Sequence, residues 1–144
     1  MTAEYVLGID YGEKRVGVAV AHFVAQLPRP LKTLPNDGEL FAAIQQIIQD
    51  EGIRQIVVGV PRNLDGSASE QTALCEQFAA AVARDVFAKV TTVDETLSSV
   101  EAEEYVLSGS KAYRDVGVDA LAAAVILQRY FTESINNQIA EEQA

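Results

Sequence analysis

Apolar positions fall into short runs that predict five β-strands. Two runs, residues 5–10 and 16–21, flank a glycine-containing turn, which is typical of a β-hairpin. A proline-marked passage predicts a third strand, at a sheet edge, around residues 31–34. The β-branched stretch within 55–60 indicates a strand covered on both faces, and residues 89–94 form a further strand.

Helical spacing predicts two helices between these strands. The first begins after the turn-forming residues 36–39, carries one apolar face, and ends at Gly52. Either Ser67 or Ser69 can cap the second helix, which we expect to run to about Ala88.

The last part of the chain predicts two more helices and a tail. A capping box at its start predicts a helix over about 98–107, followed by a polar loop at 108–116. An almost wholly apolar helix is expected over about 117–131. We therefore expect one domain over residues 1–133 and a polar tail over 134–144.

This order of elements predicts an α/β fold with a mixed sheet of five strands. An antiparallel meander opens the sheet, parallel strands extend it, and helices cover both faces. In such sheets, ligands bind beyond the carboxyl ends of strands near the topological switch. Asp10 and Glu95 follow two of these strand ends, and Asp65 lies a short way past a third.

Composition excludes several classes of protein. A chain of 144 residues with 49% hydrophobic content can bury a core and is not a disordered chain. Its apolar runs are too short to cross a membrane, and no secretory signal precedes the first strand, so we expect a cytoplasmic protein. The single cysteine, Cys75, lies beside an apolar helical stripe and is expected to be a buried structural thiol.

The formal net charge of −10 opposes nucleic-acid binding, because an acidic chain repels phosphate at long range. The local field can nevertheless differ from the global charge. Five basic residues lie near the motifs described below: Lys14, Arg15, Arg62, Lys111 and Arg114.

Three acids at the ends of apolar elements are candidates for a metal site. Taken singly, Asp10 can cap a turn, Glu95 can be a solvated acid, and Asp119 can be a first-turn acid favoured by the helix dipole. As a set, they supply the oxygen ligands that Mg²⁺ prefers, with positions left for water and phosphate. Two such ions about 4 Å apart can activate a water and stabilise the leaving oxygen in phosphodiester cleavage.

Four segments, in order along the chain, resemble the motifs of the YqgF/RuvX family of pre-16S ribosomal RNA nucleases and Holliday-junction-resolvase-like proteins: GIDYGEKRVGVAVA, VVGVPRNLDGSASEQ, VDETLSSVEAE and VDALAAAVILQRYF. The resemblance extends from about Tyr5 to Phe131. It implies a ribonuclease-H-like nuclease domain over 1–133 that uses Mg²⁺ or Mn²⁺. It also implies that the catalytic, metal-binding acids are Asp10, Glu95 and Asp119.

The resemblance further implies an endonuclease acting on structured RNA, in 5′-end processing of pre-16S ribosomal RNA. The candidates for substrate binding are Lys14, Arg15, Arg62, Asn63, Thr96, Lys111 and Arg114. Two departures from the usual motifs of the family lower the expected affinity for nucleic acid. Thr96 stands where the family usually has arginine, and the loop at 108–116 is poorer in cations than is usual. Asn63 has an equally good explanation as a turn residue.

Other functions remain open from the sequence. A resolvase of branched DNA is the nearest alternative and requires a two-fold dimer, so the chain is expected to be a monomer or a homodimer. A nucleic-acid-binding module without catalysis would suit the acidic charge, whereas the intact acids disfavour it. A sugar kinase or ATPase of related fold would need a second, duplicate domain that 144 residues do not provide.

Overall fold

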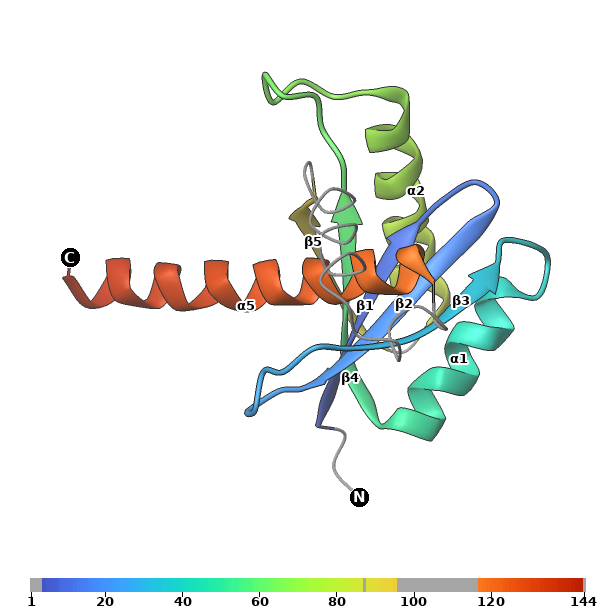
Figure 1. The fold of residues 1–144 in the computed structure, drawn as a ribbon, viewed down its shortest axis with the longest axis horizontal. Helices are drawn as coiled ribbons and strands as arrows, with labels where there is room; N and C mark the ends of the chain where they lie inside the picture. Colours follow the sequence, from blue (N-terminus) through green and yellow to red (C-terminus); the bar gives the residue numbers. More distant parts are fainter. Residues whose placement is uncertain (1–3, 87, 96–116, 144) are drawn as a thin grey trace.

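The structure of the chain is a computed structural model that describes residues 4–86, 88–95 and 117–143. These residues form a five-stranded mixed sheet in the order β3-β2-β1-β4-β5 (Figure 1). The strands are β1 (Tyr5–Tyr11), β2 (Arg15–His22), β3 (Arg29–Pro35), β4 (Ile53–Val60) and β5 (Lys89–Asp94). The first three pair antiparallel, β4 pairs parallel with β1, and β5 pairs parallel with β4, which confirms the predicted sheet.

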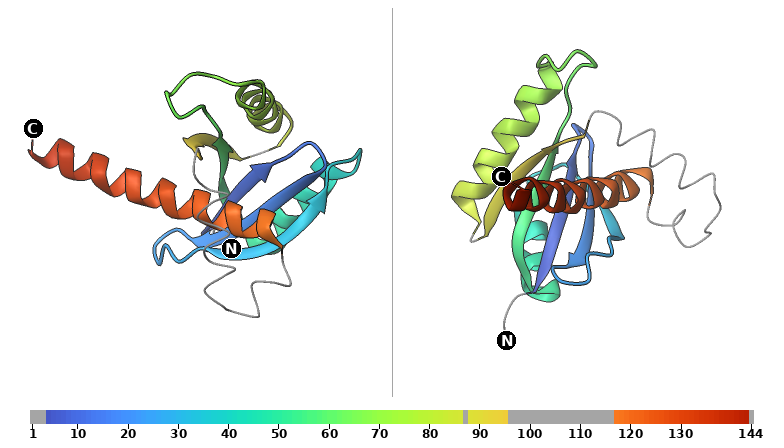
Figure 2. Two further views of the ribbon diagram at one scale, coloured as in Figure 1. Left: turned by 45° about the horizontal axis from the view of Figure 1, so that its top comes forward. Right: turned by 90° about the vertical axis from the view of Figure 1, so that its left-hand side faces the viewer.

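Helices cover both faces of this sheet (Figure 2). On one face, α1 (Leu40–Glu51) and α2 (Glu70–Asp85) pack on large aliphatic side chains of the strands. On the other face, α5 (Val118–Gln143) crosses the strands and buries a second cluster. In the part of the chain that the structure describes, no helix is long and apolar enough to span a membrane.

Local signals set the ends of α1 and α2. Gly52 ends α1 in the left-handed conformation with φ 67°, as predicted. Of the two candidate caps, Ser69 begins α2, and its hydroxyl accepts a hydrogen bond from the backbone N–H of Thr72. The expected end of α2 near Ala88 is wrong. The buried Val86 is extended and leads the chain toward β5, so the helix ends at Asp85.

The last helix is longer than its apolar pattern indicates. It ends at Gln143 and not near residue 131, because residues 132–143 contain no glycine or proline to stop it. The apolar pattern therefore marks only the part that packs on the sheet. The helix expected at 98–107 and the loop expected at 108–116 lie outside the described residues. The division into a domain over 1–133 and a tail over 134–144 stays a prediction.

Small residues on the sheet let α5 approach closely. A Cβ placed on Gly8 would lie 2.6 Å from Cγ of Leu127. A Cβ on Gly17 would overlap the backbone carbonyl of Asp119 and lie 2.7 Å from the next backbone nitrogen. The start of α5 is therefore seated directly on β2.

Candidate active site

Strand pleating places two of the predicted acids on the face that α5 covers. Asp10 lies near the end of β1, and its neighbours Ile9 and Tyr11 pack with the cluster on the opposite face. Glu95 directly follows β5, and its backbone N–H donates to the carbonyl of Val60 at 3.2 Å. Because β4 separates β1 from β5, the two carboxyls can meet only across β4.

Gly59 of β4 provides the space for that meeting. A Cβ at this position would lie 2.8 Å from Cδ of Glu95 and 2.9 Å from one carboxyl oxygen. With only hydrogen there, the Glu95 side chain lies over β4 and shares a hydrogen bond with Asp10. Gly59 was not among the predicted site residues, although a glycine inside a β-branched strand signals a close approach.

The two carboxyls are held where ionisation is unfavourable. Glu95 is 8% exposed, and burial raises its pKa to about 9, with the charge of Asp10 acting in the same direction. Burial also raises the pKa of Asp10 to about 6, while the hydrogen bond from Glu95 opposes that rise. We infer that the pair shares one proton, which Glu95 donates to Asp10.

This shared proton predicts a pH-dependent stability in metal-free solution. A carboxyl whose pKa is higher in the folded state binds its proton more tightly after folding. Its contribution to stability is therefore present at low pH and is lost as the pH rises through the folded-state value. For Glu95 that window extends from the ordinary pKa of a glutamate, 4.5, to its folded-state pKa of about 9. We expect the free energy of unfolding, measured by urea titration in EDTA, to fall as the pH rises across this window.

The control for this prediction is Glu95→Gln, which cannot ionise. Subtracting its pH profile removes every contribution that the two proteins share, so that the difference reports on Glu95 and its partner Asp10. A wild-type profile parallel to that of Glu95→Gln would contradict the shared proton.

Asp119 is the third predicted acid, and α5 brings it to the same edge of the sheet. Its backbone rests on Gly17, which is paired with Asp10 in the β1–β2 ladder. Its charge contributes to the raised pKa of Asp10. The Asp119 carboxylate also forms an ion pair with Arg15, with Nε to Oδ2 at 3.0 Å.

The acids fit a divalent cation in their chemistry. Among the described residues, no three His, Cys, Asp or Glu side chains converge as a ready metal site. Asp10 and Glu95 nevertheless present two carboxyls that burial holds together through one proton. A hard cation that prefers oxygen ligands can take the place of that proton and offset the repulsion between two neighbouring carboxylates, of which Glu95 is buried.

The other predicted site residues are dispersed. Lys14 lies exposed in the turn between β1 and β2. Arg62 lies just beyond β4 and pairs with Glu76 at 3.4 Å. The amide of Asn63 donates to the hydroxyl of Ser67 at 2.9 Å. Asn63 therefore stabilises a turn, which was the alternative to substrate binding in the sequence analysis. The remaining three candidates, Thr96, Lys111 and Arg114, lie outside the described residues.

Two further residues contact the site without having been singled out. Arg129 of α5 donates from Nη1 to the carbonyl of Asp94 at 2.9 Å, and its charge acts to lower the pKa of Glu95. Its signal in the sequence is the single cation of the largely apolar motif VDALAAAVILQRYF. Gln71 of α2 donates to the carbonyl of Tyr11 at 3.0 Å and so braces the backbone just after Asp10.

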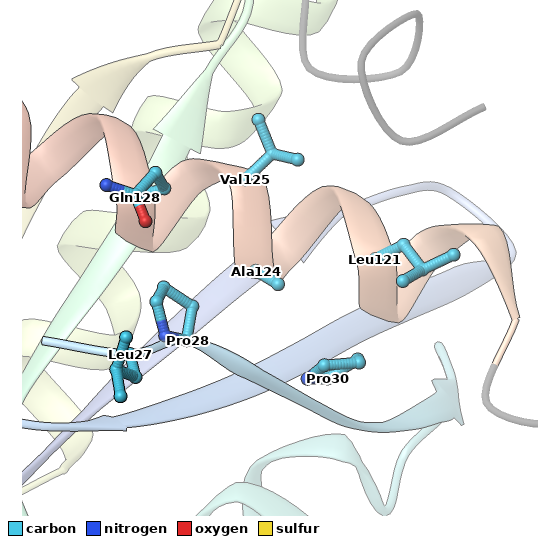
Figure 3. A pocket seen from close by; sticks show the side chains of 7 residues that line it. All are labelled: Leu27, Pro28, Pro30, Leu121, Ala124, Val125 and Gln128. Atoms are coloured by element: carbon cyan, nitrogen blue, oxygen red, sulfur yellow. The ribbon is translucent and has the colours of Figure 1, made fainter. Parts of the chain in front are cut away.

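A hollow of about 220 Å³ is lined by none of these acids. It is formed between α5 and the start of β3 (Figure 3) and is lined by Leu27, Pro28, Pro30, Leu121, Ala124, Val125 and Gln128. None of these residues is acidic or basic. The hollow is therefore separate from the candidate chemistry.

The fold and the placement of the acids define a class of protein. A mixed sheet with this strand order and acids near the ends of β1 and β5 is ribonuclease-H-like. The chain is similar in fold to RuvC of T. thermophilus in complex with a Holliday junction substrate, with a TM-score of 0.60 and 18% identity over 91% of this chain and 96% of that one. It is also similar to the Fowlpox virus resolvase, with a TM-score of 0.54 and 10% identity over 91% and 98% of the two chains.

Sequence comparison identifies the family. The family model RuvX, described as Holliday junction resolvase, matches residues 4–133, and the chain belongs to this family. Similar proteins carry the name "Putative pre-16S rRNA nuclease". The one from Chloroflexus aggregans is 34% identical over 90% of this chain and 94% of its own length. The one from Paraburkholderia phymatum is 40% identical over 87% and 83% of the two lengths.

Proposed function

We propose that this chain is a divalent-metal-dependent endonuclease that hydrolyses phosphodiester bonds in structured RNA. Its role is the 5′-end processing of pre-16S ribosomal RNA in ribosome biogenesis, in the cytoplasm. The observation that carries the proposal is the hydrogen-bonded Asp10–Glu95 pair beside Asp119. The relatives named for pre-16S rRNA, at 34% and 40% identity, support RNA as the substrate.

The three acids would hold Mg²⁺ or Mn²⁺, which when bound activates a water and stabilises the leaving oxygen. The chain itself positions these acids. Because Gly59 has no side chain, the Glu95 carboxyl can reach Asp10 across β4. Asp10 and Glu95 would release their shared proton on becoming metal ligands. Burial of Glu95 places the pair in surroundings less polar than water, which strengthens the charge interactions there.

Binding of the RNA backbone falls to cations at the same edge of the sheet. Lys14 and Arg15 lie at the hairpin turn that follows Asp10, where their charge offsets the net −10 of the chain locally. The other candidates for this role are Arg62, Asn63, Thr96, Lys111 and Arg114.

Resolution of branched DNA is the second candidate function. The observations that favour it are the description of the matching family and the fold shared with T. thermophilus RuvC. Cutting a four-way junction symmetrically requires two active sites in a two-fold dimer. The proposed RNA nuclease can act as a monomer or as a homodimer.

The test is cleavage of labelled precursor RNA, single-stranded RNA and a four-way DNA junction, each with Mg²⁺, with Mn²⁺ and with EDTA. We expect the precursor RNA to be cut fastest, with either metal, and no cutting in EDTA. Equal or faster cutting of the DNA junction would favour the resolvase. Cutting that persists in EDTA would refute the metal centre.

A further inference from the structure

The ion pair between Arg15 and Asp119 joins a proposed substrate-binding cation to a proposed metal ligand. Arg15 is the first residue of β2, and Asp119 is the second residue of α5. The Arg15 side chain is 68% exposed and that of Asp119 is 31% exposed, so solvent and ligands can reach both partners. One cation thus occupies the carboxylate that the metal centre requires.

The two partners differ in how far they can move. The backbone of Asp119 is seated on Gly17, where even a Cβ would not fit, so the main chain at Asp119 is held against the strand residue that pairs with Asp10. Arg15 carries a long and mostly exposed side chain at the end of a hairpin turn. Any exchange of partners at this contact therefore moves mainly the Arg15 side chain and leaves the backbone of Asp119 in place.

A nucleic-acid phosphate is a better partner for Arg15 than the half-buried carboxylate of Asp119 is. The guanidinium fork binds phosphate through two parallel hydrogen bonds, whereas the contact with Asp119 is made by Nε. Exposed ion pairs contribute little to stability, so the exchange costs little. Once Arg15 has turned to a phosphate, both oxygens of Asp119 become available beside Asp10.

We propose that Arg15 competes with the metal ion for Asp119 in the free protein and exchanges Asp119 for a phosphate of the substrate. Metal and nucleic acid then bind cooperatively, and the third carboxylate is released only when substrate is present. Arg15 acts here as a positioning residue, in addition to binding phosphate. The proposal rests on the metal centre of the proposed function.

The first experiment measures the affinity for Mn²⁺ alone, by calorimetry and by the electron paramagnetic resonance signal of the free ion. We expect Arg15→Ala to bind Mn²⁺ about two- to five-fold more tightly than wild type, the range that corresponds to loss of one exposed ion pair. The matched control is Lys14→Ala. It removes a cation from the same turn and leaves the Arg15–Asp119 contact in place.

A double-mutant cycle identifies the partner. In an Asp119→Asn background, Arg15→Ala should no longer raise the affinity for Mn²⁺, because the carboxylate for which they compete is gone. An equal gain in Arg15→Ala and Lys14→Ala would overturn the proposal. So would a gain from Arg15→Ala that persists with Asp119→Asn.

The cooperativity has its own measurement. A short single-stranded RNA with phosphorothioate linkages, which resist cleavage, should raise the affinity for Mn²⁺ in wild type. This RNA-induced increase in the affinity for Mn²⁺ should be smaller in Arg15→Ala, because its Asp119 is already available to the metal without RNA. An equal factor in both proteins would refute the exchange.

Asp10→Asn separates failure of this proposal from failure of the metal centre. If Asp10→Asn binds Mn²⁺ as tightly as wild type, the metal centre itself is wrong, and the exchange falls with it. If Asp10→Asn weakens Mn²⁺ binding while Arg15→Ala behaves like Lys14→Ala, the metal centre stands and only the exchange is wrong.

Discussion

Asp10→Asn is expected to reduce metal-dependent cleavage by more than about 100-fold while the fold remains intact. Substitutions in the outer shell of a metal site already cost about 10- to 100-fold in activity, and the loss of a direct ligand, the role that we propose for Asp10, should cost more. The amide keeps the size of the side chain and its place at the end of β1. The measurement is the initial rate of cleavage of precursor RNA at saturating Mg²⁺.

The same variant should be more stable than wild type without metal. Glu95 is buried, Asp10 is half-buried, and the pKa values of both are raised, so the folded state is strained at any pH at which both carboxyls would otherwise ionise. Replacing one acid by an amide removes that repulsion, and an active site commonly trades stability for function in this way. We expect a higher melting temperature in EDTA near pH 8. Mg²⁺ should raise the melting temperature of wild type more than that of the variant.

The matched control is Asp50→Asn, which removes one charge at an exposed position near the end of α1. It should leave both the cleavage rate and the response of the melting temperature to Mg²⁺ as in wild type. Cleavage by Asp10→Asn at a rate near that of Asp50→Asn would refute the assignment of Asp10.

Gly17→Ala is expected to damage the fold at the junction of β2 and α5. The added Cβ would overlap the carbonyl of Asp119, which is backbone and cannot rotate away. Overpacking of this kind costs about 1–3 kcal/mol, and more where backbone has to move. The shift also displaces Asp119 from Asp10. We therefore expect a lower free energy of unfolding and slower cleavage together, measured by urea titration and by the RNA assay.

Gly38→Ala provides the comparison for this prediction. A Cβ at Gly38 meets no atom within 4 Å, and its φ lies outside the positive range. Its effect on the free energy of unfolding should stay within about 0.5 kcal/mol. If Gly17→Ala proves as stable as Gly38→Ala, the close seating of α5 on β2 is wrong.

Local patterns predicted the sheet well, because strand alternation, turn residues and helix caps act over a few neighbouring residues. The hairpin around Gly12, the stop at Gly52 and the strand ending at Asp94 all follow from such signals. The length of α5 could not be predicted in this way, because its final turns lack the apolar stripe that marks a helix packed on a sheet.

The candidate site depended on contacts that no local pattern contains. The sequence indicated which acids end apolar elements, but the meeting of Glu95 with Asp10 requires the space over Gly59, on a strand between them. Likewise, Arg15 and Asp119 are far apart along the chain, and only the seating of α5 brings them into contact. The candidate acids could thus be predicted from the sequence, whereas tertiary packing determines which of them form contacts.

Cys75 has a practical consequence. It is the single cysteine of the chain, it is fully buried in α2, and burial raises the pKa of its thiol to about 12. A maleimide or iodoacetamide reagent attacks thiolate, so the folded protein offers it almost no target. A cysteine introduced on the surface can therefore be labelled selectively without first removing the native one. Fluorophores attached in this way at the hairpin turn and on α5 would report their separation during substrate binding.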